Sequence, residues 1–185
     1  HPFRPFLVCI CFAAFLCTSP LLRAQNLVVY DNLEQLQSSI SRAGDTTLVL
    51  NFWATWCNPC VEELHYFDVL QESYGSQNVQ VVLVSLDFKS NLDKKVVPLL
   101  KRKQLKSEVA LMADQDLNAW IPEIYDGWDG GIPATLVMQG KKRLFKSGKF
   151  ASPIELDTFV RPLILDSAVF VAQKKTYKDL SSGKK

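Results

Sequence analysis

The stretch TTLVLNFWATWCNPC, residues 46–60, decides the fold. Its first part, Thr46 to Trp53, is rich in β-forming residues and nearly all apolar, which is typical of a central strand covered on both faces. Cys57 and Cys60 follow closely, and apolar residues then recur at helical spacings up to Tyr74. The stretch therefore predicts a buried strand that leads directly into a helix, with both cysteines in the first turn of that helix.

Two cysteines at positions i and i+3 in a first helical turn can form a small disulfide. Cys57 faces the unpaired N–H groups of that turn, which together with the helix dipole favour a thiolate. Thiols of C-x-x-C motifs at such positions have pKa values of roughly 3.5–7.5, compared with about 8.5 for a free cysteine. A Cys57 thiolate can attack a disulfide of a partner, and Cys60, which we expect to be more buried, can resolve the mixed disulfide.

Other uses of a C-x-x-C pair are less compatible with the sequence. A zinc site needs more ligands, but residues 25–185 contain no second cysteine pair, and their only histidine is His65. Covalent haem attachment requires a histidine directly after the second cysteine, where this chain has Val61. We therefore expect no metal and no cofactor, and we expect His65 on the surface of the helix. A permanently closed, structural disulfide remains an alternative.

Strands and helices alternate on both sides of the cysteine motif. Apolar β-type runs predict strands at residues 27–30, 79–86, 109–113, 134–138 and 143–147. Helical periodicity predicts helices at residues 33–43, 59–74, 92–103, 117–125 and 153–165. Pro98 either kinks the third of these helices or divides it into two pieces. This order predicts an α/β fold with a central mixed β-sheet flanked by helices on both faces.

The first residues differ from the rest of the chain. Arg4 precedes an uninterrupted apolar run from Leu7 to Leu16, and small and polar residues follow up to Ala24. This pattern is typical of a secretory signal peptide, and the run is shorter than the roughly 18–20 residues of a membrane-spanning helix. We expect residues 1–24 to be a signal peptide, with a retained membrane anchor as the alternative, residues 25–165 to be the folded domain, and residues 166–185 to be a C-terminal tail.

Composition and charge exclude several classes of protein. The chain has 185 residues, of which 48% are hydrophobic and 22% charged, so it can form one globular domain and is not disordered over most of its length. Removal of residues 1–24 takes away two of the 21 basic side chains and no acidic one, which leaves 19 of each sign. A balanced charge predicts no nucleic-acid partner. The same removal leaves only Cys57 and Cys60, so the domain is not a disulfide scaffold.

These residues resemble the thioredoxin superfamily, and within it the exported TlpA/ResA-like thiol-disulfide oxidoreductases. The resemblance rests on WATWCNPC after a strand and on Ile132-Pro133 before another strand, and it covers roughly Leu27 to Leu165. It implies a thioredoxin-like fold, with Cys57 as the nucleophile and Cys60 as the resolving thiol of a redox-active disulfide. It also implies a cis Ile132–Pro133 bond beside the disulfide, where backbone groups of Ile132 bind the substrate chain.

The resemblance also concerns the proton acceptor for the resolving thiol. Cytoplasmic thioredoxins have a buried aspartate six residues before the first cysteine, where this chain has Asn51. TlpA/ResA-like proteins instead have a glutamate three residues after the second cysteine, which here is Glu63. Glu63 lies one helical turn from Cys60 and could take its proton. Alternatively, Glu62 and Glu63 only complement the N-terminus of the helix.

Three tryptophans lie in or near the proposed site. We expect Trp53 to pack in the core and Trp56 to be exposed for docking of a substrate. Trp128, in the glycine-rich approach to Pro133, either shapes a substrate groove or packs within a surface loop. The sequence does not decide between these two interpretations.

The function that fits best is dithiol–disulfide exchange outside the cytoplasm, in the periplasm or cell envelope, with reduction favoured over oxidation. We expect disulfide-containing substrate proteins, an upstream thiol donor of electrons for which a membrane protein is one candidate, and a monomer. One alternative is a peroxiredoxin-like peroxidase, although that family has a threonine three residues before its reactive cysteine, where this chain has Ala54. The other alternative is a non-catalytic binding module of thioredoxin shape with a closed disulfide.

Overall fold

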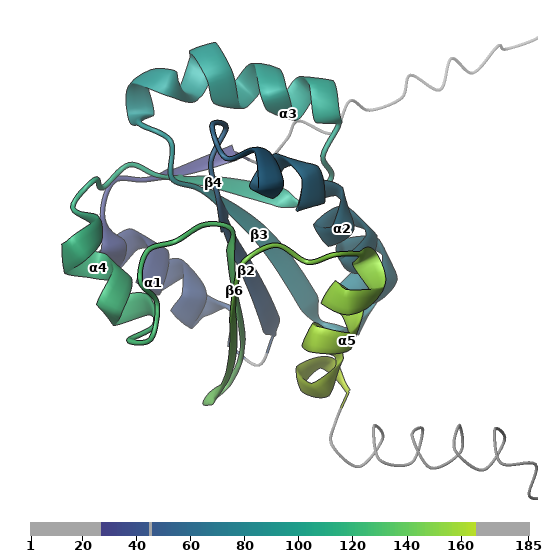
Figure 1. The fold of residues 1–185 in the computed structure, drawn as a ribbon. Coiled ribbons are helices and arrows are strands. Elements are labelled where there is room, and N and C mark those ends of the chain that lie inside the picture. Colours follow the sequence, from purple (N-terminus) through teal and green to yellow (C-terminus); the bar gives the residue numbers. More distant parts are fainter. Residues whose placement is uncertain (1–26, 45, 166–185) are drawn as a thin grey trace, which may run out of the picture.

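One mixed β-sheet forms the centre of the protein (Figure 1). The structure, a computed structural model, describes residues 27–44 and 46–165. Six strands pair in the order β1-β4-β3-β2-β5-β6. Their bounds are β1 Leu27–Tyr30, β2 Thr47–Trp53, β3 Val79–Ser85, β4 Glu108–Met112, β5 Ala134–Gln139 and β6 Lys142–Ser147. The first four strands are parallel to one another, whereas β5 is antiparallel to β2 and β6 is antiparallel to β5.

Helices cover both faces of this sheet, as Figure 1 shows. The helices are α1 Leu33–Arg42, α2 Asn58–Tyr74, α3 Val97–Lys103, α4 Leu117–Ile124 and α5 Pro153–Ile164. Short helical turns are η1 Gly75–Gln77, η2 Lys89–Asn91 and η3 Leu92–Val96. The buried residues of α2, α3 and α5 pack in one core cluster, and those of α1 and α4 pack in the other. The predicted α/β architecture with helices on both faces is confirmed.

Strand β2 is central because both of its faces are apolar. All seven of its residues are buried. Val49 and Trp53 pack with the α2 side of the sheet, and Leu50 and Phe52 pack with the α1 side, as the alternation of side chains along a strand requires. The strand is bonded along its length to β3 and β5. The end of β2 is therefore fixed by both neighbouring strands, and the cysteine motif begins soon after it.

The segment 92–103 is divided in two, the second of the alternatives that Pro98 left open. Residues Leu92–Val96 form a wide π-type turn, and α3 begins at Val97 with Pro98 in its first turn. Proline is tolerated there because first-turn N–H groups lack partners within the helix. Pro122 lies inside α4, which runs without interruption from Leu117 to Ile124.

The predicted signal peptide and C-terminal tail lie outside the described residues. Within residues 27–44 and 46–165, no helix is both long enough and apolar enough to span a bilayer.

Candidate redox site

Cys57 and Cys60 form a disulfide at the start of α2. Cys57 is the N-cap residue of the helix, and its Sγ accepts a hydrogen bond from the backbone N–H of Cys60 at 3.3 Å. This contact fits the expected interaction between this sulfur and the free N–H groups of the first turn. Cys60 is completely buried, whereas Cys57 keeps 6% of its surface exposed. An incoming reactant can therefore reach Cys57 and not Cys60.

The Ile132–Pro133 bond lies beside this disulfide and is cis. Cys57 Sγ is 3.8 Å from the carbonyl oxygen of Ile132. Two contacts fix the position of Pro133. Its carbonyl oxygen accepts a hydrogen bond from Gly148 N at 2.8 Å, and β5, which begins at the next residue, pairs with β2. The structure thus brings together three of the residues singled out in the sequence, Cys57, Ile132 and Pro133, although Cys57 lies 75 positions before Ile132.

Glu63 lies in a buried polar cluster on the α2 side of β2. Its side chain has no exposed surface. Oε2 accepts a hydrogen bond from Phe150 N at 2.7 Å, and Oε1 accepts one from Asn51 Nδ2 at 3.2 Å. Asn51 Nδ2 also donates to Thr135 Oγ1 at 3.1 Å, while Asn51 Oδ1 has no hydrogen-bond partner. Asn51 and Glu63 therefore contact each other directly and belong to one buried polar cluster.

Burial raises the pKa of Glu63 to about 7. Removal of the carboxylate from water is the main cause, and it outweighs the hydrogen bonds from Phe150 and Asn51 and the positive charges of Lys146 and Lys149, all of which lower the pKa. Such a group exchanges a proton readily near neutral pH. The adjacent Glu62 behaves differently, because it is exposed and its hydrogen-bonded ion pair with Lys149 lowers its pKa.

The alternative role of Glu63, which is to complement the helix N-terminus, does not match its position. The first turn of α2 contains no acidic residue, and both oxygens of the Glu63 carboxylate accept hydrogen bonds from outside the helix. Glu63 follows Cys60 by one helical turn, so the two side chains share one face of α2.

Of the three tryptophans singled out in the sequence, one is exposed and two are buried. Trp56, directly before Cys57, is 64% exposed, and Trp53 is completely buried, as predicted. Trp128 is also buried. Its ring lies 4.5 Å from that of Phe52, and its Nε1 donates to Gly131 O at 2.8 Å. The structure therefore favours packing of Trp128 within its loop over the groove interpretation.

A second buried carboxylate, Asp87, lies beside the motif and was missed in the sequence. It has no exposed surface and accepts hydrogen bonds from Thr55 N at 2.8 Å, Thr55 Oγ1 at 2.6 Å and Ser85 Oγ at 2.9 Å. A signal for it was present: Asp87 comes directly after the apolar run 79–86, and carboxyl ends of adjacent parallel strands meet at one edge of a sheet. Thr135 gave no such signal, because its role depends on contact with Asn51.

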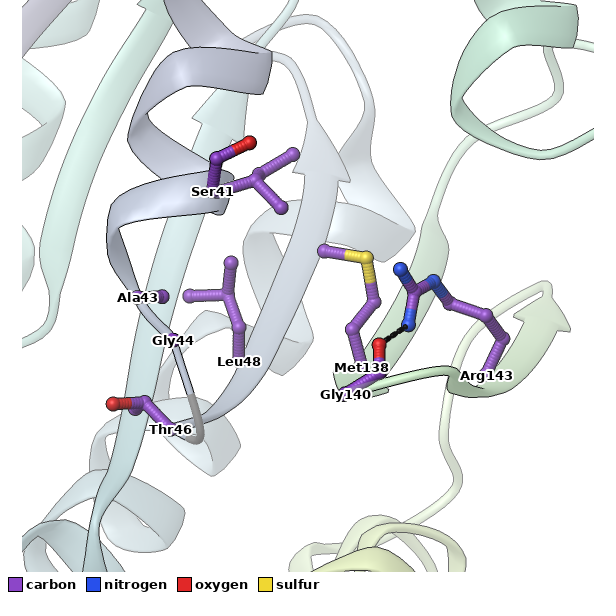
Figure 2. A pocket seen from close by; sticks show the side chains of 9 residues that line it. Ser41, Ala43, Gly44, Thr46, Leu48, Met138, Gly140 and Arg143 are labelled. Atoms are coloured by element: carbon purple, nitrogen blue, oxygen red, sulfur yellow. Dashed lines mark hydrogen bonds between the residues drawn. The ribbon is translucent and has the colours of Figure 1, made fainter.

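One pocket of the structure lies away from the disulfide, and the described residues form no metal-binding group. The pocket in Figure 2 is lined at its apolar wall by Leu48 and Met138, and Arg143 donates to Gly140 O there at 2.7 Å. It adjoins the first residues of β2, whereas the disulfide lies beyond the last, so the length of the strand, about 20 Å, separates them. Among the described residues, no group of three or more histidine, cysteine, aspartate or glutamate side chains is placed to bind a metal ion.

His65 lies on the outer face of α2. Its side chain is exposed, and its ring packs edge-on against that of Tyr66. The expectation of an ordinary surface histidine is confirmed.

Comparison with known proteins relates the chain to one family. The model of the AhpC/TSA family matches residues 23–144. The thiol-disulfide oxidoreductase ResA of Oceanobacillus iheyensis is 37% identical over 59 residues, 32% of this chain and 31% of that protein. ResA of Bacillus thuringiensis subsp. konkukian is 33% identical over 88 residues, 48% of this chain and 49% of that protein. The chain thus matches 31% and 49% of the length of these two relatives.

A solved structure extends the similarity over most of the fold. A putative thiol:disulfide interchange protein DsbE from Chlorobium tepidum superimposes with a TM-score of 0.54 at 25% identity, over 68% of this chain and 85% of that one. The predicted thioredoxin-like fold and the resemblance to ResA-type proteins are confirmed by these findings together.

Proposed function

The chain belongs to the AhpC/TSA family, and we propose that it is a thiol-disulfide oxidoreductase that reduces protein disulfides outside the cytoplasm. The observation that carries the proposal is the Cys57–Cys60 disulfide in the first turn of α2, with Cys57 at its accessible end. ResA proteins, which are thiol-disulfide oxidoreductases, are 37% and 33% identical to parts of this chain. Export is supported by the apolar run from Leu7 to Leu16 and by the small and polar residues between this run and Ala24.

The reaction begins with the reduced protein. The Cys57 thiolate attacks one sulfur of a substrate disulfide, the substrate S–S bond breaks, and the displaced substrate thiolate takes up a proton. Cys57 is then joined to the substrate in a mixed disulfide. Cys60 loses its proton and attacks Cys57 Sγ, which releases the second substrate thiolate, and this thiolate takes up a proton in turn. Two electrons pass to the substrate, and a thiol donor must later reduce Cys57–Cys60 again.

Cys60 needs a proton acceptor because it is completely buried. A buried thiol keeps its proton unless a nearby group accepts it. Glu63 is suited to this role because it lies one turn away on the same helix and because its pKa of about 7 allows both protonation states near neutral pH. In this proposal Glu63 acts in the second step of the cycle and has no part in the first attack by Cys57.

Substrate binding in this proposal uses the backbone of Ile132 and the exposed ring of Trp56. The carbonyl oxygen of Ile132 lies 3.8 Å from Cys57 Sγ, so a chain whose sulfur contacts Cys57 also reaches this backbone. Trp56 precedes Cys57 and offers a large apolar ring to the same chain. The partners are disulfide-containing proteins and an upstream thiol donor, and we expect the protein to act as a monomer.

The test is to trap the mixed disulfide. The Cys60→Ser variant, reduced and mixed with a disulfide-containing protein, should retain that protein covalently on Cys57, as mass spectrometry of the linked peptides can show. The matched Cys57→Ser variant should trap nothing. If the Cys57→Ser variant traps the substrate protein on Cys60 more readily than the Cys60→Ser variant traps it on Cys57, the assignment of Cys57 as the nucleophile is contradicted.

A measurement of reduction potential separates the proposal from a structural disulfide. A catalytic Cys57–Cys60 pair should lie above roughly −300 mV, whereas a permanently closed one should lie below it. A parallel assay with hydrogen peroxide separates it from a peroxidase. We expect rapid oxidation of the reduced protein by disulfides and slow oxidation by peroxide, and the reverse order would contradict the proposal.

A further inference from the structure

Hydrogen bonds join the segments that follow β2 and β3 just beyond the last residues of the two strands. Trp53 pairs with Ser85 in the register of the two strands, and Leu86 N donates to Trp53 O at 2.8 Å. Next along the chain, Thr55 is bonded to Asp87 through both its N–H and its hydroxyl. Trp56 and Phe88 are the residues that directly follow this hydrogen-bonded pair, Trp56 after Thr55 and Phe88 after Asp87.

Asp87 holds this arrangement from inside the protein. It is completely buried, and it accepts three hydrogen bonds from the two segments that it joins. Ser85 strengthens the turn, because its hydroxyl donates to the Asp87 carboxylate and accepts from Asp87 N at 3.2 Å. Hydrogen bonds to a buried carboxylate are strong and costly to lose, so the position of the next residue, Phe88, is set by the core.

Phe88 and Trp56 are both exposed, and this sets them apart from other rings of the protein. Among the described residues, five large hydrophobic side chains are exposed, and only these two are aromatic, Phe88 at 58% and Trp56 at 64%. The other three are Val28, Val69 and Ile154. Single exposed apolar residues need no explanation, but here both exposed aromatic residues directly follow the hydrogen-bonded pair Thr55 and Asp87, and one of them precedes the reactive Cys57. Exposed aromatic side chains near a reactive group are typical of a binding surface.

We propose that Phe88, which follows the Asp87 bonded to Thr55, contacts the substrate polypeptide together with Trp56 and selects disulfides that have an apolar residue next to the cysteine. The inference rests on the proposed function, because the occupant is the chain whose sulfur must reach Cys57, the neighbour of Trp56. A chain whose sulfur reaches Cys57 lies close to the Ile132 carbonyl, which is 3.8 Å from Cys57 Sγ, and to the exposed Trp56 that precedes Cys57. A small disulfide without a polypeptide reaches Cys57 and gains nothing from Phe88.

The test compares three substrates for the reduced protein. Two are synthetic disulfide-bonded peptides that differ only in the residue after the cysteine, phenylalanine or serine, and the third is the small, polar bis(2-hydroxyethyl) disulfide. For the wild type we expect kcat/KM to favour the phenylalanine peptide by about tenfold or more, since burial of one aromatic side chain contributes on this scale. The Phe88→Ser variant should lose this preference and reduce the small disulfide at the wild-type rate.

Two further variants serve as controls. Ile154→Ser removes an exposed apolar side chain from α5, and it should behave as the wild type with all three substrates. Phe88→Leu keeps an apolar side chain and should restore most of the preference. If Phe88→Ser retains the full preference for the phenylalanine peptide, the inference is wrong and the proposed function stands. If the wild type reduces none of the three disulfides, the proposed function fails and the inference fails with it.

Discussion

Two completely buried carboxylates flank the cysteine motif, and they are supplied with hydrogen bonds very differently. Asp87 accepts three hydrogen bonds from donors of its own and the neighbouring segment, at 2.6 to 2.9 Å. Glu63 accepts two, and one of them is long, at 3.2 Å. Next to Glu63, Asn51 Oδ1 has no hydrogen-bond partner.

The difference indicates different tasks for similar groups. A carboxylate fully supplied with donors fixes the segments that donate to it, and any change breaks several bonds at once. A carboxylate that is buried with few donors is poorly stabilised as an anion, and burial raises the pKa of Glu63 to about 7. Asp87 is therefore the positioning group of the site, and Glu63 is the group suited to proton exchange. Substitutions at the two positions should accordingly differ in whether they change chemistry or stability.

The largest effect should come from loss of the Glu63 carboxylate. Glu63→Gln should leave the attack of Cys57 on a model disulfide unchanged and slow the resolution by Cys60 roughly 10²–10⁴-fold, since the general base is removed. In the wild type, resolution should accelerate as the pH rises through about 7, where Glu63 loses its proton. Single-turnover kinetics from pH 5 to 9 measure both steps.

The adjacent glutamate provides the matched control for this variant. Glu62→Gln removes an exposed carboxyl that pairs with Lys149, and both steps should keep wild-type rates. Superimposable resolution rates for wild type and Glu63→Gln across the pH range would exclude Glu63 as the proton acceptor.

The same carboxyl should make stability depend on pH. Because the pKa of Glu63 is raised in the folded state, from 4.5 to about 7, the folded protein holds this proton more firmly than the unfolded chain. Its contribution therefore favours folding below pH 4.5 and is lost as the pH rises to about 7, by about 3 kcal/mol in total. Denaturant titrations of the disulfide-bonded wild type and Glu63→Gln should diverge by this amount over that interval. Parallel curves would contradict the burial argument.

Loss of the Asp87 carboxylate should act on stability and little on chemistry. Asp87→Asn keeps the shape but removes one acceptor oxygen, so at least one of the bonds from Thr55 or Ser85 is lost. We expect the free energy of unfolding to fall by about 1–3 kcal/mol. Reduction of bis(2-hydroxyethyl) disulfide should stay within about twofold of wild type, because the hydrogen bonds of Asp87 reach Thr55 and Ser85 and neither cysteine. A loss of resolution comparable to that of Glu63→Gln would remove the distinction between the two carboxylates.

The smallest effect should come from Thr135→Val, which removes the second acceptor of Asn51 Nδ2 without a change in shape. We expect a loss of about 0.5–1.5 kcal/mol in the free energy of unfolding, the net contribution of one hydrogen bond. Asn51 keeps its bond to Glu63, so resolution by Cys60 should be preserved. A change in the pH midpoint of resolution would show that Thr135 takes part in setting the proton affinity of Glu63.

Local patterns in the sequence were enough to predict the elements and the reactive pair. An apolar strand that ends at Trp53, with two cysteines at i and i+3 soon after it, places the pair on the first turn of a helix through rules that act within a few residues. Glu63 could be placed on the face of Cys60 for the same reason. The approximate bounds of the strands and helices came from periodicity and from glycine and proline positions.

Contacts between distant segments could not be predicted in this way. The hydrogen bond from Phe150 N to Glu63 joins residues 87 positions apart, and it depends on how the segment after β6 packs against α2. The bond from Asn51 to Glu63 depends on the packing of α2 over β2. Trp128 had two interpretations because its burial depends on the rings of Phe52 and Phe145, which come from strands β2 and β6.

The central claim is that burial makes Glu63 a proton acceptor near neutral pH, and its titration tests this claim most directly. Carbon-13 NMR of the disulfide-bonded protein, labelled at the glutamate side-chain carboxyls, monitors each group, with Glu63 assigned by its absence in Glu63→Gln. We predict a midpoint of about 7 for Glu63, and for the neighbouring Glu62 a pKa below that of an ordinary glutamate. A midpoint for Glu63 near the ordinary value of 4.5 would contradict the account.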